Sequence, residues 1–172
     1  SVMDANGIIF NGTDKGLCIH SGIKYYYEKK IKDRITSLLI DKKGYLWAGT
    51  WSKGLYRIQY SSNKVTRGFA KDTTGLSVED FSYLLPDKSI RHLFEDSKGY
   101  IWVGTRNAGI VQLDNNSNEK YTIKRFDLRQ GLMSNWTKFI AEDAKGCIWI
   151  GSNLGIDKLI PAANTFRVFN FS

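Results

Sequence analysis

The sequence predicts an all-β fold, and within that class a partial β-propeller of about four blades, each built from four antiparallel strands. One apolar strand–turn–strand unit recurs four times along the chain. Its short apolar segments are rich in β-branched and aromatic residues, and hardly any window shows the i, i+3, i+4 spacing of an amphipathic helix. Four such blades would form about half of a larger propeller.

The repeated unit is an apolar strand, an Asp-x-Lys-Gly turn, a strand that ends in Trp-apolar-Gly-Thr, a short polar loop and another apolar strand. It is clearest at 90–113 and recurs at 35–58 and 139–159. A diverged copy at 6–19 has Phe10 in place of the tryptophan. Periods of roughly 40 to 50 residues are typical of four-stranded propeller blades. The turn glycines are 37, 55 and 47 residues apart, and they are Gly7, Gly44, Gly99 and Gly146.

The first predicted blade, about 1–30, contains three clear strands. They lie near 8–11, at 16–20 and at 25–27, where the last would be the outer strand. An inner strand is missing unless residues 1–5 supply a short one. Completion of this blade therefore depends on the first residues of the chain.

The second predicted blade, about 31–70, is followed by the longest interval between copies. Its strands are expected at 35–40, 45–48, 55–58 and 64–69. Residues 70–89 are expected to form either a long loop or a small ordered insertion, because several of their side chains favour burial. These are Phe81, Tyr83, Leu84 and Leu85.

The last two predicted blades complete the single domain, which covers 1–172. The third, about 88–127, has its outer strand at 121–126. The fourth, about 136–171, ends with an outer strand at 166–169. A chain of 172 residues is long enough for one domain with a sizeable core.

The recurring turn residues have a structural explanation. Asp41, Asp96 and Asp143 each stand three residues before a turn glycine. An aspartate at the start of a tight turn accepts hydrogen bonds from the following backbone N–H groups, and glycine tolerates a positive φ. Aspartates at a fixed spacing also suggest a metal site, but blade turns lie far apart around a ring. We therefore predict no metal and no cofactor.

A tryptophan and a glycine recur in the second strand of each unit. The tryptophan is predicted to be a wedge between blades that buries on the order of 200 Å². The glycine two residues later is predicted to let a neighbouring strand or ring approach closely. These residues are Trp47 and Gly49, Trp102 and Gly104, and Trp149 and Gly151.

The composition limits the classes of partner. A net charge of +8 and a pI near 9.4 favour anionic partners in general. The basic residues are scattered apart from Lys29–Arg34, and no stripe alternates basic and aromatic residues, so nucleic acid is not predicted. No apolar run of about 18 residues is present, so we predict no direct membrane insertion. Cys18 and Cys147 are predicted to be buried free thiols.

The pattern apolar strand, Asp-x-Lys-Gly, x-Ile-Trp-Ile-Gly-Thr and x-x-Gly-Ile/Leu resembles the two-component regulator propeller repeat. The resemblance covers essentially the whole chain, in three strong copies and one weak copy. The segment 126–136, with Gly131 and Leu132 before Asn135, is similar to the usual linker of that family. The copies depart from the pattern at Phe10, Asn11 and Ser152.

This resemblance implies a non-catalytic sensor module from the periplasmic region of a bacterial hybrid two-component system histidine kinase. Such a module would detect a carbohydrate-type ligand and relay the signal to the kinase. Family sensors are similar to closed rings, typically of seven blades, and continue into an immunoglobulin-like domain, a membrane helix and a kinase. None of these later parts is recognisable here, and the N-terminus has neither an initiator Met nor a signal pattern. The four units are therefore expected to be a piece of a larger sensor, with its remaining blades and kinase as partners.

Candidate ligand residues follow from propeller topology. Loops between second and third strands, and connections from an outer strand to the next inner strand, meet on one ring face. There, exposed tryptophans would offer a face to a pyranose ring, and arginines would suit a uronate or a sulfate through bidentate hydrogen bonds. The alternative is that these are ordinary solvated loop residues, with Trp136 buried at the start of a strand. The candidates are Trp51, Lys53, Arg106, Asn107, Arg129, Gln130, Asn135, Trp136 and Asn153.

Two other functions remain open. A lyase-type propeller enzyme would need a positioned acid or base, for which the chain offers only His20 and His92 and the adjacent acids Glu79 and Asp80. No nucleophile–base set is recognisable, so we predict no catalytic residue. A protein-interaction or dimerisation scaffold is the other alternative. Half a ring would expose two apolar end faces, so the isolated chain is predicted to self-associate.

Overall fold

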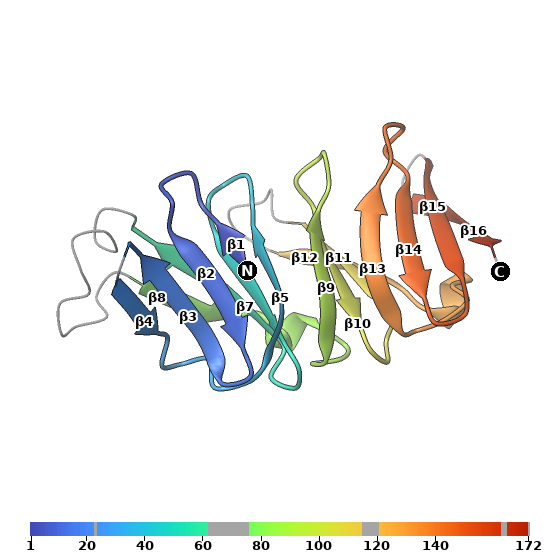
Figure 1. Cartoon of the computed structure of the whole chain (residues 1–172). Coiled ribbons are helices and arrows are strands. Elements are labelled where there is room, and N and C mark those ends of the chain that lie inside the picture. The colour runs from blue at the N-terminus through green and yellow to red at the C-terminus, as the bar shows by residue number, and fades with distance from the viewer. Residues whose placement is uncertain (23, 62–75, 115–120, 163–164, 172) are drawn as a thin grey trace.

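The computed structural model of the chain describes residues 1–22, 24–61, 76–114, 121–162 and 165–171. These residues form four sheets, each of four antiparallel strands that pair in sequence order. The sheets stand one after another, and each fans outward from its first strand to its fourth (Figure 1). The predicted all-β partial propeller is therefore confirmed.

Each sheet is one blade. The first contains β1 (Val2–Met3), β2 (Ile9–Thr13), β3 (Gly16–Ser21) and β4 (Lys24–Tyr27). The second contains β5 (Ile35–Ile40), β6 (Leu46–Thr50), β7 (Leu55–Tyr60) and β8 (Leu76–Asp80). The third contains β9 (Ile90–Glu95), β10 (Ile101–Thr105), β11 (Ile110–Asp114) and β12 (Thr122–Phe126). The fourth contains β13 (Thr137–Glu142), β14 (Ile148–Ser152), β15 (Ile156–Ala162) and β16 (Thr165–Phe171).

The outer strand of the second blade differs from the sequence expectation. The strand expected at 64–69 lies outside the described residues, and the strand that pairs with β7 is β8, within the segment expected to be a loop or insertion. A short 3-10 helix, η1 (Ser82–Leu84), follows β8. Phe81 is buried there, with its ring 5.1 Å from Trp47 and 4.7 Å from Tyr121 between centroids. Burial of this ring orders the connection into the third blade.

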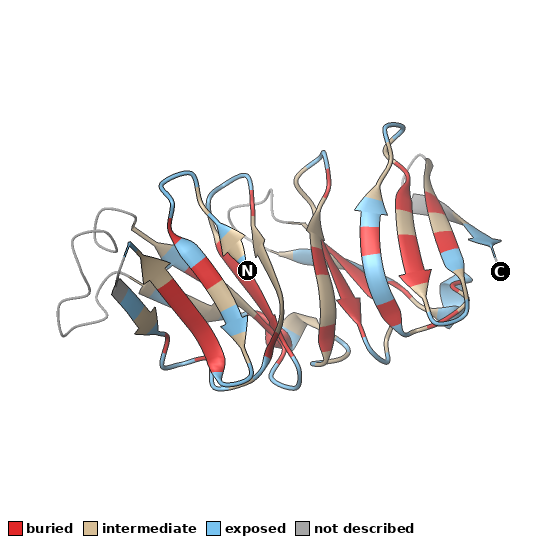
Figure 2. Ribbon diagram, viewed as in Figure 1, coloured by how far each residue is buried: buried red, intermediate tan, exposed pale blue. Residues whose placement is uncertain are grey.

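The apolar cores lie between neighbouring blades, as the buried stripes on facing strands show (Figure 2). Trp47 packs with Ile90 and other residues of the third blade, and Trp102 packs with Ile140 and other residues of the fourth. Both tryptophans are fully buried, whereas Trp149 on β14 is half-buried and stacks on Phe171 at 5.7 Å. The difference arises because, among the described residues, the outer face of the fourth blade is not packed against another sheet.

Each turn aspartate accepts hydrogen bonds both from the backbone of its turn and from a tryptophan indole. In the third blade, Asp96 Oδ1 accepts hydrogen bonds from the backbone N–H groups of Lys98 and Tyr100, at 3.0 and 2.9 Å. Its other oxygen, Oδ2, accepts from the indole Nε1 of Trp102 at 2.8 Å. Asp41 and Trp47, and Asp143 and Trp149, repeat this bond at 2.8 and 2.9 Å. The aspartate therefore fixes both the turn and the orientation of the wedge.

The strand glycines lie where the next blade comes closest. A Cβ on Gly49 would be 2.5 Å from Ile90 Cγ2, and one on Gly104 would be 2.6 Å from Thr137 Cγ2. In both places the first residue of the next inner strand fills the space. At Gly151 the Phe139 ring of the same blade fills it instead, with Cε1 at 1.7 Å from such a Cβ.

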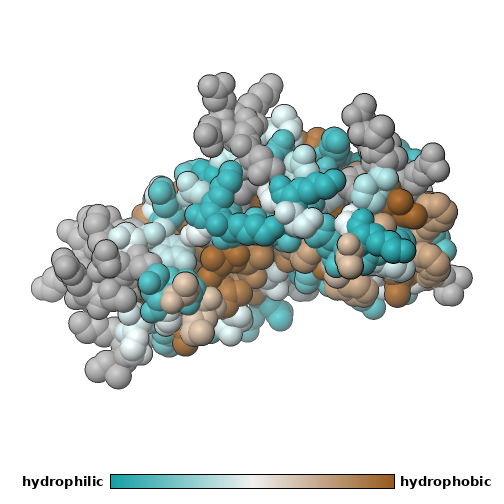
Figure 3. All heavy atoms as spheres, turned by 90° about the horizontal axis from the view of Figure 1, so that it is seen from above, coloured by the Kyte–Doolittle hydropathy of each residue, from teal (hydrophilic) through white to brown (hydrophobic). Residues whose placement is uncertain are grey.

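The surface is mixed in character. Seen from the side of the Asp-x-Lys-Gly turns, hydrophilic residues form a band across the molecule, and hydrophobic atoms are exposed beside it and at the C-terminal end (Figure 3). Cys18 and Cys147 are free and buried, as predicted. Within the described residues, no helix is long and apolar enough to cross a membrane.

Candidate functional site

The connections expected to meet on one ring face do meet there, at the ends of the blades opposite the Asp-x-Lys-Gly turns. Backbone hydrogen bonds tie the loops after β6 and β10 to segments that enter an inner strand. Trp51 N donates to Arg34 O at 2.9 Å, Arg106 N to Ser89 O at 3.0 Å, and Gly109 N to Asn135 O at 2.9 Å. The backbone of this face is thus braced before any ligand binds.

Side chains brace the same loops. Asp33 Oδ2 accepts from the backbone N–H groups of Ser52 and Lys53, at 2.7 and 2.9 Å. Asp87 Oδ2 plays the same part for Asn107, with 2.8 Å to its backbone N. Partial burial alone would raise the pKa of Asp33, but the hydrogen bonds from Ser52, Arg34 and Lys53 outweigh it and hold that pKa below its usual value. Asp33 and Asp87 therefore stabilise the conformation of these loops.

Three of the candidate ligand residues line one hollow of about 320 Å³ on this face. Trp51 comes from the loop after β6, Arg106 from the loop after β10, and Trp136 from the segment before β13. Arg91 and Lys138 line the same hollow, together with Thr137. We call Trp51, Arg91, Arg106, Trp136 and Lys138 the ring-face cluster.

Guanidinium groups lie against tryptophan rings within this cluster. The guanidinium carbon of Arg91 is 4.0 Å from the centroid of Trp51. That of Arg106 lies between the two tryptophans, 5.6 Å from Trp51 and 5.5 Å from Trp136. Arg34 also approaches Trp51, at 5.4 Å. These distances are within the range of cation–π attraction, which stabilises the arginines beside the tryptophan rings.

Arg91 and Lys138 were not among the candidates from the sequence. Both are the extra residue of a β-bulge in their inner strand, because the register shifts between Gly104 and Thr105 in one blade and between Thr137 and Phe139 in the other. A bulge turns a side chain out of the regular alternation. Thr36 occupies the same place in β5. A basic residue second in an inner strand is the signal that could have identified them.

The other candidates have structural partners. The Asn107 amide donates to Asp87 at 3.1 Å, Gln130 accepts from the backbone of Asp127, and Asn135 accepts from the backbone of Leu128. Asn153 accepts from Ser134 at 2.7 Å, and Arg129 pairs with Asp127. Lys53 is exposed in the loop that Asp33 braces. None of these six lines the hollow of the ring-face cluster.

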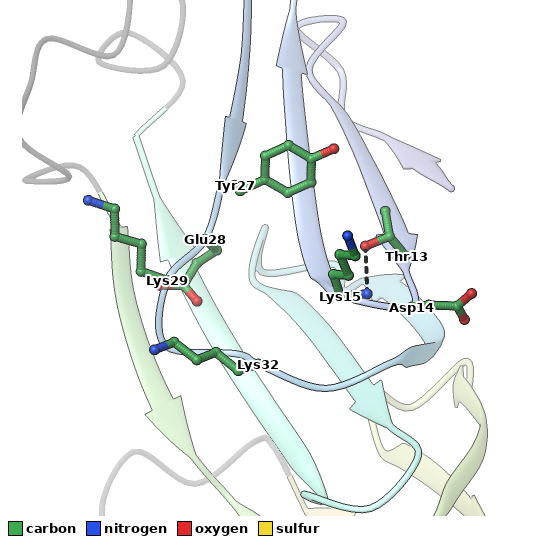
Figure 4. A pocket seen from close by; sticks show the side chains of 7 residues that line it. All are labelled: Thr13, Asp14, Lys15, Tyr27, Glu28, Lys29 and Lys32. Atoms are coloured by element: carbon green, nitrogen blue, oxygen red, sulfur yellow. Dashed lines mark hydrogen bonds between the residues drawn. The ribbon is translucent and has the colours of Figure 1, made fainter.

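A second, larger hollow of about 730 Å³ lies beside the first blade (Figure 4). Its lining includes Lys15, Lys29, Lys32 and Tyr27. The amino groups of Lys29 and Lys32 point to a different side from that of Lys15. Glu28 is used by the loop itself, because its Oε2 accepts from the backbone of Lys30 and Ile31 at 2.7 Å each. The charged groups here do not converge on one point, so we favour the smaller hollow as the site.

The groups considered for catalysis are engaged elsewhere. His92 Nδ1 accepts from the backbone N–H of Ile140 at 3.2 Å, and burial lowers the pKa of His92. Glu79 lies on β8 and pairs with Arg57 at 2.7 Å. Among the described residues, no group of three or more His, Cys, Asp or Glu could hold a metal ion.

Comparison with known proteins identifies the repeat. The family described as "Two component regulator propeller" matches residues 30–52 and 84–107. The chain contains two-component regulator propeller repeats. The two matched repeats contribute Trp51, Arg91 and Arg106 to the ring-face cluster.

One relative by sequence and two solved structures are similar to this chain, and each of the three is longer than it. "Histidine kinase P4" of Formosa agariphila is 31% identical over 70% of this chain, which spans 7% of that protein. The extracellular domain of BT4673 from B. thetaiotaomicron, a protein assigned as a hybrid two component system, superposes with a TM-score of 0.70 and 21% identity over 97% of this chain and 20% of its own. Virginiamycin B lyase from Staphylococcus aureus has a TM-score of 0.69 and 14% identity over 99% of this chain and 54% of its own. At these identities the two structural likenesses establish the propeller fold.

Proposed function

We propose that this chain is a non-catalytic, extracytoplasmic sensor module of a two-component system. In this proposal a carbohydrate-type ligand binds the ring-face cluster, and its occupancy is relayed to a histidine kinase. The matched propeller repeats and the relative described as a histidine kinase support the sensor role. A periplasmic location belongs to the same proposal, since a solved relative is an extracellular domain.

One observation carries the ligand part of the proposal. Trp51 and Trp136 belong to different blades, yet both reach one hollow and remain 38% and 40% exposed. Exposed aromatic faces beside charged donors suit a sugar ring, which has apolar C–H faces and polar hydroxyl groups at its edge. A flat apolar patch would instead favour a protein partner. The ring-face cluster combines exposed aromatic rings with charged donors, and this combination supports a sugar rather than a protein partner.

The test is a calorimetric titration of the chain with a panel of oligosaccharides. For any sugar that binds, Trp51→Ala and Trp136→Ala should each weaken binding at least about tenfold, because a factor of ten corresponds to only about 1.4 kcal/mol of lost contact. Tyr83→Ala is the matched control, since Tyr83 is an exposed aromatic residue that lines neither hollow. Unchanged affinity in both tryptophan variants would contradict the proposed site.

A protein-interaction or dimerisation scaffold is the second candidate. The observation in its favour is the exposed apolar surface of the end blades. Met3 and Tyr25 are each 66% exposed in the first blade, and Phe169 and Phe171 are 47% and 49% exposed in the fourth. The remaining blades of a longer sensor are the partners that fit these faces, and both roles can coexist with ligand binding at the ring face.

A further inference from the structure

We infer that the ring-face cluster is an anion site, in which Arg91 and Arg106 bind one carboxylate or sulfate group of the ligand while Trp51 and Trp136 contact its sugar ring. This inference rests on the proposed sensing function and specifies its ligand as an acidic saccharide.

The first argument is the charge of the hollow. Its described lining contains three cationic side chains, Arg91, Arg106 and Lys138, and no carboxylate. Arg34 lies nearby and pairs with Asp14 at 3.1 Å, but both side chains are largely exposed, so that pair contributes little local neutralisation. An anion placed in the hollow would meet positive charge from two blades and the entry to a third.

The second argument is an unsatisfied donor. Arg91 Nε is buried and has no hydrogen-bond partner within the described structure. Buried donors are normally paired, and one left unpaired is costly. The guanidinium carbon of Arg91 is 4.0 Å from the Trp51 centroid, and a carboxylate or sulfate oxygen that binds the N–H edge of this guanidinium would supply the acceptor that the structure lacks.

The third argument is the mutual repulsion of the arginines. Burial lowers the pKa of Arg91, and the neighbouring charges of Arg106 and Arg34 lower it further, against the opposing effect of Asp87. The β-bulge in β9 nevertheless directs this side chain into the hollow. A bound anion would compensate for the cost of desolvation and would offset the repulsion between the arginines.

The size of the hollow sets the scale of the ligand. At about 320 Å³ it lies at the small end of the range for ligand pockets. It has room for one charged sugar unit beside the arginines and at the exposed parts of the two tryptophans, while further units of an oligosaccharide would extend over the ring face.

The experiment compares matched probes on the whole chain. Calorimetric titrations would use trigalacturonate, the same trisaccharide with its carboxyl groups reduced to alcohols, and sodium sulfate, all in about 150 mM sodium chloride. Trigalacturonate should bind at least about tenfold more tightly than its neutral counterpart. Arg91→Gln and Arg106→Gln should each remove that preference. Arg125→Gln, on the exposed outer strand β12, makes the same charge change away from the hollow and should retain it.

The outcomes separate this inference from the proposed function. Equal binding of the acidic and neutral trisaccharides would overturn the anion site and leave carbohydrate sensing intact. If neither sugar binds but sulfate does, with loss in both arginine variants, the anion site stands and carbohydrate sensing fails for these sugars. If no probe binds, the anion site is overturned. Circular dichroism would check the fold of each variant, and the exposed position of Arg106 keeps one variant informative should Arg91→Gln misfold.

Discussion

At the scale of single residues, the turn aspartates stabilise both a turn and a buried ring. The diverged first copy shows how the arrangement survives without an indole. Asp4 accepts from the backbone of Asn6 and Ile8, at 2.9 Å each, as the other turn aspartates do. Phe10 has no N–H to donate, and the hydroxyl of Tyr60 from the next blade bonds Asp4 instead. Burial, followed by the charge of Asp4, raises the pKa of Tyr60 to about 12.

Removing such a carboxylate in the interior should be costly. Asp96 is buried, so Asp96→Ala would leave the Trp102 indole N–H and two turn N–H groups without their acceptor. We expect the free energy of unfolding to fall by roughly 3 kcal/mol in urea denaturation. Asp14→Ala, which breaks only the exposed pair with Arg34, should cost less than about 1 kcal/mol. Equal costs for the two variants would contradict this role of the turn aspartate.

At the scale of the strands, side chains link one inner strand to the next. Ser37 Oγ accepts from the backbone N–H of Leu93 at 3.0 Å, and His92 Nδ1 accepts from Ile140 in the same way. Ser37, His92 and Phe139 occupy equivalent places, each opposite the strand glycine of its blade. Ser37 and His92 therefore each accept a hydrogen bond from the inner strand of the following blade, and Phe139 cannot.

The link through His92 should depend on pH. Its acceptor role requires an unprotonated Nδ1, and burial places the pKa of His92 below its ordinary value near 6.5. The unfolded chain therefore takes up this proton first, so the stabilisation is complete above about pH 6.5 and is lost as the pH falls towards the folded-state pKa.

The measurement is the melting temperature of wild type and His92→Gln between about pH 8 and pH 5. The difference between them should change across this range, and wild type should lose more stability on acidification. Ser37→Ala removes the equivalent bond without a titrating group, so its difference from wild type should stay constant. A constant difference for His92→Gln would refute the pH-dependent link.

How far the sequence predicts these elements depends on patterning. β5 lies where expected, at Ile35–Ile40, because its apolar, β-branched sequence is followed directly by an Asp-x-Lys-Gly turn. β8 is not predicted as a strand because Leu76–Asp80 is short and contains only two apolar residues, Leu76 and Val78. The convergence of Trp51, Arg106 and Trp136 follows from topology. Arg91 and Lys138 do not follow from topology, because the bulge that turns them out depends on strand pairing. The sequence marks them only as basic residues in the second position of an inner strand.

At the scale of the whole molecule, four blades leave two open ends. Interior wedges such as Trp102 are fully buried, whereas Trp149 is not. The exposed apolar residues at the ends gather on outward faces of the first and last blades. Monomeric proteins rarely expose contiguous apolar patches, so exposed apolar end faces favour self-association.

We therefore expect the isolated chain to dimerise through its end blades. Light scattering over a concentration series should give a molar mass near twice 19.6 kDa. Phe169→Glu, which places a charge on the exposed face of β16, should shift the mass toward 19.6 kDa. Tyr83→Glu is the control, since Tyr83 lies on η1 rather than on an end face. A monomer at every concentration would contradict the prediction.

Phe139 makes the open face of the fourth blade differ from the corresponding faces of the second and third blades. At the interfaces of the second blade with the third and of the third with the fourth, the strand glycine leaves space for a residue of the incoming strand. A polar side chain opposite that glycine accepts a hydrogen bond from the same strand. On the fourth blade the molecule's own ring occupies this space, and the neighbouring position offers no acceptor. A partner strand that packs on this face must displace the Phe139 ring or pack against it. The two faces of the fourth blade therefore differ. A hydrogen bond aligns the face towards the third blade, whereas the outward face presents an aromatic ring.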